Sequence, residues 1–587
     1  MVNNNDKYKN YSREELIDEL ETLKKKKYGL VWDKKNSQEI LDAFVNWENV
    51  PEKFTPKQFP VLKEIKNKEI ETDKTKPVNL LIEGDNYHSL AVLNFTHQNK
   101  IDVIYIDPPY NTGNNDFRYN DKFIDREDSF RHSKWLSFME KRLGLAQKLL
   151  KNTGVIFISI DDNEQAQLKL LCDEIFDEEN FVANLIWRKK RGGGRGNSLI
   201  IPQTEYILVY AKNISKLEPF TKKLSEHKFD AFKYEDKCGK YKREGLDHHS
   251  PQGAYERKTL QYDLIIDNKA IYCPTGQWLW SKDRVRKELE DVIDEIKGEN
   301  IYRNLDITKD NKNRWRASKK VRLNIGEEVR QETLLSFIDD PKITTNSSAQ
   351  EIINFFREAV FNYSKPAELI KYILKPCCSN NSVVLDFMAG SGTMAQAVLE
   401  LNKEDGGKRK FILCTNDEEI NNNGDKIKHK ICTDVCYPRI EKVINGYKNS
   451  KGEKVAGLGG NLKYFKTDFV GSDSTDKNKR DLVNKSADMI CVKEDIFDLL
   501  AGKEFDYRIY QKDKKFLGIV FDLDAIADFK KEAEKFKGNF VVYCFSYSEF
   551  PPEKEFGKMK NKYVLKPIPA VILKVYSEIF KDKKSKK

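Results

Sequence analysis

Residues 100–110, KIDVIYIDPPY, are an apolar run that ends in Asp-Pro-Pro-Tyr. Short apolar runs without polar alternation are typical of strands buried on both faces of a sheet. Because proline cannot continue the pairing of a central strand, we expect the strand to end here, with Asp107 at its carboxyl end. That edge is where open α/β sheets bind their ligands.

Apolar runs of the same kind alternate with helix-like segments on both sides of this motif. Further strands are predicted in VNLLIEGDN (78–86), GVIFISID (154–161), YILVYAK (206–212), SVVLDF (382–387) and KRKFILC (408–414). Helices are predicted in SKWLSFMEKRLGLAQKLL (133–150), NEQAQLKLLCDEIF (163–176), EIINFFREAVF (351–361), AELIKYIL (367–374) and MAQAVLEL (394–401). This alternation predicts an α/β fold, a parallel sheet covered by helices on both faces.

The chain is expected to divide into five parts. These are an N-terminal helix (13–27) and arm over 1–78, a first part of the sheet over 79–181, a polar insert over 182–350 that returns strand 206–212 to the sheet, a second part of the sheet over 351–450, and a C-terminal α/β segment over 451–587 with strands at 516–523, 539–545 and 570–576. If two separate stretches of the chain form one sheet, strand ends that are far apart in the sequence come together at one cleft.

The amino-acid composition limits the classes of protein to which this chain can belong. The 587 residues include 103 Lys and Arg against 93 Asp and Glu, and the net charge of +10 permits nucleic-acid binding without showing it. No apolar run reaches the roughly 18 residues of a membrane span, and the N-terminus lacks the apolar core of a secretory signal. Ten cysteines without a Cys-x-x-Cys pair favour reduced thiols in a cytoplasmic protein, and no Cys or His spacing predicts a metal site.

The Asp-Pro-Pro-Tyr motif has the residue types needed to activate an exocyclic amine of a nucleobase. The lone pair of such an amine is delocalised into the ring, so two acceptors, the Asp107 carboxylate and the Pro108 carbonyl, are needed to take its N–H groups. Pro108 and Pro109 hold this backbone rigidly, and Tyr110 can stack on a base taken out of the helix. The alternative interpretation is a plain strand-ending turn.

A second motif, DFMAGSGT (386–393), lies between a predicted strand and a predicted helix. Its glycines let the backbone approach a ligand, and a helix N-terminus favours a carboxylate or phosphate. The spacing matches neither a dinucleotide fingerprint nor a phosphate loop, so a nucleotide-like ligand without a pyrophosphate fits better. Alternatively, the glycines only form a tight turn into the helix.

In this order, the two motifs resemble the β-class of DNA amino-methyltransferases, which use S-adenosylmethionine. GDNYHSLAVLN, DPPYNTGNNDFRYNDKF, HSKWLSFMEKRL, GVIFISIDDNEQAQLK, YILVYAK and LDFMAGSGTMAQAVLEL are similar to the modification subunits of type III restriction–modification systems. The resemblance covers residues 79–212 and 350–445. It implies a circularly permuted Rossmann-like fold and methylation of the 6-amino group of an adenine, flipped out of double-stranded DNA within a short asymmetric motif. It also implies a homodimer and a separate restriction subunit that cleaves.

The resemblance also implies roles for single residues. Asp107, Pro108 and Tyr110 hold the target base. Cofactor contacts are implied for Asp85, Lys365, Pro366, Asp386, Phe387, Ala389, Gly390, Ser391, Gly392, Thr393, and Asp417 or Glu418. For Asp85 a turn or helix cap is the alternative, and for Pro366 a plain helix start. The acid that binds the ribose stays open between Asp417 and Glu418.

The polar insert is expected to contact DNA. Its candidate phosphate ligands form two basic clusters, Arg188, Lys189, Lys190, Arg191 and Arg195 in the first and Arg314, Arg316, Lys319 and Lys320 in the second. For any one of these cations a solvated basic loop is the alternative. Trp278 and Trp280 are expected in the core.

Three other functions stay open from the sequence. These are methylation of the cytosine 4-amino group, an inactive specificity subunit that only binds DNA, and an RNA or small-molecule methyltransferase. The intact Asp-Pro-Pro-Tyr motif argues against an inactive subunit, and the long basic insert argues for a polymer substrate. The recognition sequence cannot be read, because it depends on which side chains reach which base edges.

Overall fold

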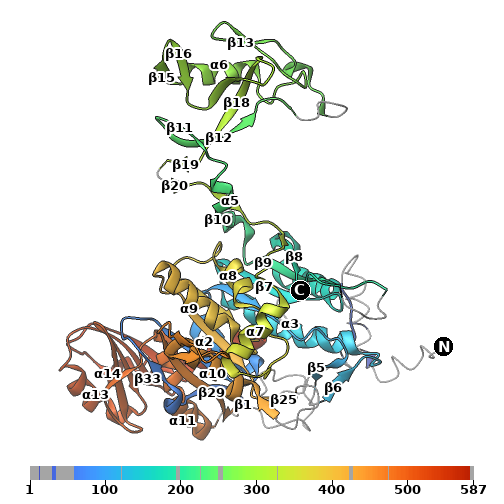
Figure 1. The fold of residues 1–587 in the computed structure, drawn as a ribbon. Helices are drawn as coiled ribbons and strands as arrows, with labels where there is room; N and C mark the ends of the chain where they lie inside the picture. Colours follow the sequence, from blue (N-terminus) through green and yellow to red (C-terminus); the bar gives the residue numbers. More distant parts are fainter. Residues whose placement is uncertain are drawn as a thin grey trace. The chain divides into compact units, whose positions relative to one another are not determined.

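The computed structural model describes residues 12–13, 17, 30–34, 58–119, 122–193, 199–224, 226–248, 255–326, 328–421, 428–472 and 475–581. The chain forms two compact units, one made of Met1–Glu218 with Leu335–Lys587 and the other of Pro219–Leu334 (Figure 1). The predicted helix over 13–27 lies almost wholly outside the described residues, and Arg195 lies outside them too. Within the described ranges, no helix is both long and apolar enough to cross a membrane.

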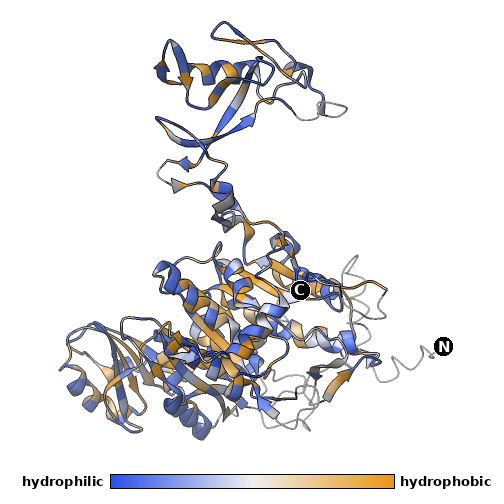
Figure 2. Cartoon of the chain, in the orientation of Figure 1, coloured by the Kyte–Doolittle hydropathy of each residue, from blue (hydrophilic) through white to orange (hydrophobic). Residues whose placement is uncertain are grey.

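The larger unit is built on an 11-stranded sheet with the order β1-β29-β3-β24-β23-β4-β7-β9-β8-β22, and β2 pairs with β29. The strands are β1 (Gln58–Glu64), β2 (Ile70–Glu71), β3 (Val78–Glu83), β4 (Ile101–Ile106), β7 (Leu150–Ile160), β8 (Phe181–Arg188), β9 (Thr204–Ala211), β22 (Phe337–Ile338), β23 (Val383–Asp386), β24 (Lys410–Thr415) and β29 (Asn461–Gly471). From β29 to β7 all neighbours are parallel, whereas β9 is antiparallel to β7 and to β8. Figure 2 shows the apolar character of the central strands.

Helices connect these strands, and the connections run toward both edges of the sheet. They are α2 (Asn86–His97), α3 (Arg131–Leu149), α4 (Gln165–Phe176), α7 (Thr345–Phe356), α8 (Ala367–Leu374), α9 (Thr393–Asp405) and α10 (Tyr437–Asn445). From β3, α2 and α3 lead to β4 and then β7 in one direction across the sheet, while from β23, α9 and α10 lead to β24 and then β29 in the other. Right-handed crossovers therefore place α2 and α3 on one face and α9 and α10 on the other.

The direction changes between β23 and β4, which pair directly, with Leu385 opposite Ile104. Ligands of doubly wound sheets bind outside the carboxyl ends of the strands at such a switch point. Asp107 and the glycine segment follow these two strands. The predicted α/β class is confirmed: the sheet is Rossmann-like and circularly permuted, because its two parts enter the chain in exchanged order.

The smaller unit has a six-stranded sheet with the order β11-β12-β18-β14-β13, with β17 paired to β18. Its elements are β10 (Thr221–Lys223), α5 (Glu226–Phe229), β11 (Tyr234–Asp236), β12 (Gly239–Gly245), β13 (Leu264–Ile266), β14 (Lys269–Ile271), α6 (Lys282–Glu290), β15 (Val292–Ile296), β16 (Glu299–Tyr302), β17 (Leu305–Lys309), β18 (Trp315–Arg322), β19 (Asn324–Ile325), β20 (Glu328–Val329) and β21 (Gln331–Thr333). Trp278 and Trp280 are buried in its apolar core, as expected.

The C-terminal part forms a second sheet with the order β30-β31-β32-β33-β34. Its elements are α11 (Asp476–Lys485), α12 (Ala487–Glu494), β30 (Asp498–Lys503), β31 (Tyr507–Lys512), β32 (Lys515–Val520), α13 (Ile526–Ala533), β33 (Asn539–Phe545), α14 (Glu553–Phe556), β34 (Tyr563–Ile568) and α15 (Ala570–Lys581). The strand predicted over 570–576 is wrong, because this segment begins α15. Buried Ile572 and Tyr576 are four residues apart, so the short apolar run fits a helix as well as a strand.

The predicted borders differ from the observed ones because strands from the flanking segments join the large sheet. β8, β9 and β22 come from the predicted insert over 182–350, so the separate unit covers only Pro219–Leu334. Likewise, β29 comes from the predicted C-terminal segment and β1 from the predicted arm, and the two pair with each other. Among the described residues, the larger unit also has three two-stranded sheets: β5 (Asn114–Tyr119) with β6 (Lys122–Asp125), β25 (Glu419–Asn421) with β26 (Lys428–Lys430), and β27 (Gly446–Lys448) with β28 (Lys454–Ala456).

Candidate functional site

Asp107 and Lys365 form an ion pair at the carboxyl end of β4. The Lys365 ammonium group donates to both oxygens of the carboxylate, with Nζ 2.7 Å from Oδ1 and from Oδ2. Lys365 directly precedes Pro366, the residue at the N-cap position of α8. Burial raises the pKa of Asp107 above its ordinary value even though Lys365 acts against it. Burial acts against the lysine too, but the charges of Asp107 and Glu205 outweigh it and raise the pKa of Lys365.

Glu205, near the start of β9, is a second carboxylate at this place. It accepts a hydrogen bond from the Tyr110 hydroxyl at 3.0 Å and one from Lys189 Nζ at 3.0 Å, and Lys365 Nζ lies 3.7 Å away. Burial alone would raise the pKa of Glu205, but the charges of Lys365 and Lys189 lower it below its usual value. Glu205 was not predicted from the sequence. The available signal was a single charge inside an otherwise apolar strand, TEYILVYA.

The turn after β4 is held from beneath by α3 and α4. The indole N–H of the fully buried Trp135 donates to the Pro109 carbonyl at 2.7 Å. Asn111, with φ +58°, donates from Nδ2 to Glu164 Oε1 at 2.5 Å, and His132 Nδ1 lies 2.6 Å from the same oxygen. Burial raises the pKa of Glu164 to about 8. These contacts fix the backbone on both sides of Tyr110.

The glycine segment turns from β23 into α9 as predicted. Gly390 has φ +51° and Gly392 has φ +77°, a region that side chains rarely adopt. A Cβ at Gly392 would lie 3.1 Å from Cys436 Sγ. Asp386, at the end of β23, is buried and accepts from the backbone N–H of Met388 at 3.0 Å, and burial together with the charge of Asp107 raises its pKa to about 8.

The side chains of this segment point away from the loop surface. Phe387 is fully buried in the apolar core. The hydroxyl groups of Ser391 and Thr393 accept from Arg439 Nη1 at 3.0 and 2.8 Å, and Ser364 joins the same network at 3.2 Å. What a ligand can meet here is therefore mainly backbone from Ala389 onward. Arg439 was not predicted, and its only sequence signal was a charge on an otherwise apolar helix stripe.

The other predicted acids stand after β3 and β24, at the same edge of the sheet. Asp85 caps α2 by accepting from the backbone N–H of Tyr87 at 2.7 Å, and its contact with the cofactor stays a prediction. Asp417 accepts from the backbone N–H and the hydroxyl of Thr433 at 2.9 and 3.0 Å. Glu418 is exposed and accepts from Asn416 Nδ2 at 2.5 Å. These contacts leave the choice between Asp417 and Glu418 open.

The predicted basic clusters belong to different units, and most of their cations are paired with carboxylates. Arg188 and Arg191 pair with Asp339, and Lys189 with Glu205. In the smaller unit the pairs are Arg314 with Asp310, Arg316 with Asp247, Lys319 with Glu244 and Lys320 with Asp236. The Lys320 side chain is only 2% exposed, so it is an interior partner of Asp236 rather than a surface cation.

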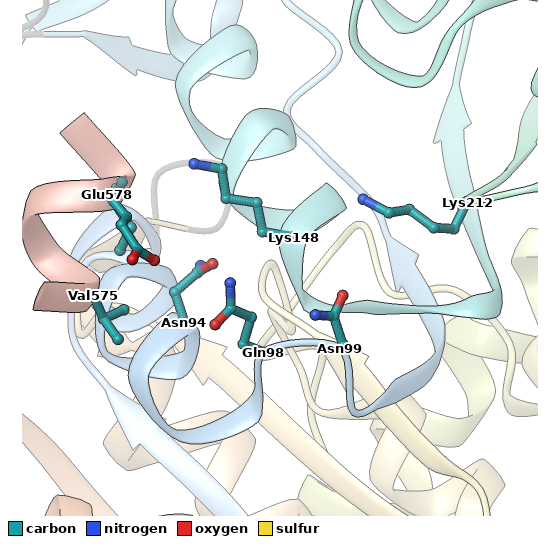
Figure 3. Close-up of a pocket in the computed structure, with 8 residues that line it drawn as sticks. Asn94, Gln98, Asn99, Lys148, Lys212, Val575 and Glu578 are labelled. Atoms are coloured by element: carbon teal, nitrogen blue, oxygen red, sulfur yellow. The ribbon is translucent and has the colours of Figure 1, made fainter. Parts of the chain in front are cut away.

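A small polar cavity lies at the opposite edge of the large sheet (Figure 3). Asn99 precedes β4, and Lys148 lies at the end of α3 just before β7, so the cavity faces the amino ends of the parallel strands. It therefore has no part in the cleft that contains Asp107 and the glycine segment.

Comparisons with known proteins agree with this geometry. A family model described as DNA methylase matches residues 101–426. The Mod subunit of the type III restriction-modification enzyme StyLTI from Salmonella typhimurium is 35% identical over 392 residues, 62% of this chain and 57% of that protein. The EcoPI Mod subunit of Escherichia phage P1 is 33% identical over 473 residues, 72% of this chain and 69% of that protein. The type II methyltransferase M.KpnI of Klebsiella pneumoniae is 31% identical over 401 residues, 63% of this chain and 89% of that protein. The chain thus spans little more than half the length of the Salmonella relative.

Proposed function

Because this chain belongs to the DNA methylase family and shares it with modification subunits of type III restriction–modification enzymes, we propose that it methylates DNA. The methyl group passes from S-adenosylmethionine to the 6-amino group of an adenine flipped out of the duplex, within a short asymmetric motif. The observation that carries the proposal is the position of Asp107 after β4, directly beside the strand that leads into the glycine segment.

Asp107, Pro108 and Tyr110 prepare the amine for the transfer. The Asp107 carboxylate accepts one N–H and the Pro108 carbonyl accepts the other, so the lone pair is drawn out of the ring and directed outward. Tyr110 stacks on the base. S-adenosylmethionine supplies a methyl group whose bonding electrons stay on sulfur when it leaves. As the new N–C bond forms, Asp107 accepts the proton that the amine loses.

The residues at the switch point fit this cofactor. The backbone at Gly390 and Gly392 permits close approach, and in the described part of the chain no side chain caps α9, so its first N–H groups can bind a carboxylate. Acidic side chains that can bind amine or hydroxyl groups stand at the ends of three neighbouring strands. They are Asp85 after β3, Asp386 at β23, and Asp417 or Glu418 after β24.

We further propose that the smaller unit and the segment containing Lys190 bind the duplex. Surface cations of these two regions contact the DNA phosphates. Arginines that pair with carboxylates in the free protein leave these partners and bind phosphate instead. We propose that the chain works as a homodimer with a separate restriction subunit, which the kinship with type III Mod subunits supports. All ten cysteines are free thiols, which supports a cytoplasmic location.

Methyl transfer by the purified chain tests this function. Amplified bacterial DNA, which contains every short motif unmethylated, is incubated with the protein and S-adenosylmethionine labelled in the methyl group, with RNA as a parallel substrate. Nucleosides are then identified by mass spectrometry. The proposal predicts labelled N6-methyladenine in DNA alone. N4-methylcytosine would assign the chain to the other amine, and label in RNA alone or the absence of label would contradict DNA methylation.

A further inference from the structure

Glu205 is the one carboxylate in contact with both Tyr110 and Lys365 that the proposed chemistry leaves without a task, among the residues the structure describes. Its side chain is only 9% exposed. Burying an ionised carboxylate is unfavourable unless it is paired. Glu205 is paired with Lys189 at 3.0 Å and accepts from the Tyr110 hydroxyl at 3.0 Å, so Oε1 and Oε2 are both held in place.

In this arrangement the charge of Asp107 is already paired with Lys365. Both of its oxygens accept from the Lys365 ammonium group at 2.7 Å. An N–H of the target adenine would have to share these oxygens with the ammonium group, and Asp107 accepts it more strongly once Lys365 has moved. A buried ammonium group that leaves Asp107 needs another acceptor, because burying an unpaired charge is strongly unfavourable.

Glu205 Oε2 is already beside the lysine. The distance from Lys365 Nζ to this oxygen is 3.7 Å, against 2.7 Å to Asp107, so a shift of about 1 Å turns an ion pair into a direct hydrogen bond. Lys365 also lies over the Tyr110 ring, with Nζ 4.9 Å from its centroid. The lysine, the tyrosine and both carboxylates therefore form one contiguous group.

We propose that Glu205 is a positioning residue that takes Lys365 over from Asp107 when the target amine arrives. No covalent bond changes in this step: one charge-assisted hydrogen bond replaces another, and Asp107 is released to accept the amine N–H. The inference rests on the proposed function, since it needs an amine at Asp107.

The electrostatics of the group agree with this role. Lys365 and Lys189 outweigh burial and lower the pKa of Glu205, so it is ionised at neutral pH and can accept the lysine. For Asp107, burial is the main cause of the raised pKa, and the charge of Glu205 adds to it. The other titratable side chains beside Asp107 in the described residues include Lys365 and Asp386, and burial raises the pKa of Asp386 to about 8.

Glu205→Gln tests the proposal, because glutamine has a similar shape without the charge. We expect kcat for methylation of amplified bacterial DNA to fall about 10- to 100-fold, as misplaced catalytic groups do. The Kd for S-adenosylmethionine should stay within about twofold. The acid limb of the pH profile should move to lower pH, because Asp107 loses a negative neighbour that raises its pKa.

Asp173→Asn is the matched control. Asp173 also accepts from a tyrosine of β9, Tyr210 at 2.6 Å, and from a lysine, Lys169 at 2.6 Å, but it lies on α4 away from Asp107. This variant should lose similar stability while keeping kcat and the acid limb. A merely structural role of Glu205 predicts the same pattern for both variants and would overturn the proposal.

Glu205→Asp covers the case in which Glu205→Gln does not fold. It keeps the charge but draws it back by one methylene, so kcat should lie between the values of wild type and of a neutral variant, with unchanged cofactor affinity. An active wild type with equally active Glu205→Gln or Glu205→Asp contradicts this inference alone. A wild type without activity contradicts the proposed function and the inference with it.

Discussion

Arg439 donates from Nη1 to the hydroxyl of Thr393 at 2.8 Å, and so ties α10 to the first residue of α9. The same guanidinium binds Ser391 Oγ at 3.0 Å and Glu351 Oε2 at 3.1 Å. Glu351 in turn accepts from the backbone N–H of Ala367, the first residue of α8. One fully buried arginine therefore connects the glycine segment with the segment that contains Lys365.

Arg439→Lys should weaken cofactor binding. Lysine keeps the charge but cannot donate to Thr393, Ser391 and Glu351 together. We expect the Kd for S-adenosylmethionine, measured by calorimetry, to rise about tenfold and the stability to fall by about 3 kcal/mol. Arg409→Lys is the control, since Arg409 is also buried but binds Asp405 at the other end of α9. An equal rise in Kd for both variants would show that the effect is only loss of stability.

Lys365→Met should move the acid limb of activity to higher pH. Burial already raises the pKa of Asp107, and Lys365 is the main group that opposes this. Without the lysine the carboxylate takes up a proton at higher pH, and methylation needs it ionised. Activity measured between pH 5 and 9 should therefore begin to fall at a higher pH than in wild type. Lys151→Met, which removes an exposed partner of Asp102 on the same strand, should leave the limb in place.

Glu164→Gln should stabilise the protein at alkaline pH. The folded-state pKa of Glu164 is about 8, above the ordinary value of 4.5, so the folded protein keeps a proton that the unfolded chain releases. Wild-type stability is therefore lost as pH rises through this window. The variant should gain about 4 kcal/mol over wild type at pH 8 and little at pH 4.5, measured by urea unfolding. Glu179→Gln, at an exposed glutamate, is the control for the substitution itself. A pH-independent gain in Glu164→Gln would contradict the account of Glu164.

Lys190→Gln should weaken DNA binding by removing a phosphate contact. The slope of log K against log salt should fall by about 0.9 for one lost contact. Lys320→Gln is the comparison, because Lys320 is buried beside Asp236. It should destabilise the smaller unit and leave the slope unchanged where that unit is folded. The reverse pattern would mean that the ion pair with Asp236 opens on DNA.

The strands and the position of Asp107 could be predicted because buried parallel strands are apolar along their whole length and prolines mark where β4 ends. The borders between the five predicted parts of the chain could not be predicted in this way. β22 is a two-residue strand whose pairing with β8 depends on a partner about 150 residues away. The strand prediction for 570–576 is wrong because a short, mainly apolar segment fits the period of a strand and that of a helix.

The site was predicted only in part, for a related reason. Motifs such as Asp107 with its prolines are visible in the chain, but Glu205 and Arg439 obtain their roles from partners brought to them by the fold. The sequence also shows cations without showing their carboxylates. Arg314, Arg316, Lys319 and Lys320 read as a basic cluster, yet each has an acidic neighbour in the structure.

The most direct test of the central claim is single-molecule sequencing of DNA from cells that express this chain alone, compared with cells that express Asp107→Ala. The account predicts N6-methyladenine on one strand of a short asymmetric motif with the wild type, and none with the variant, whose affinity for S-adenosylmethionine is retained. The same adenines modified by both proteins would remove Asp107 from the mechanism. No modified adenine with a wild type that binds both cofactor and DNA would contradict the proposed activity.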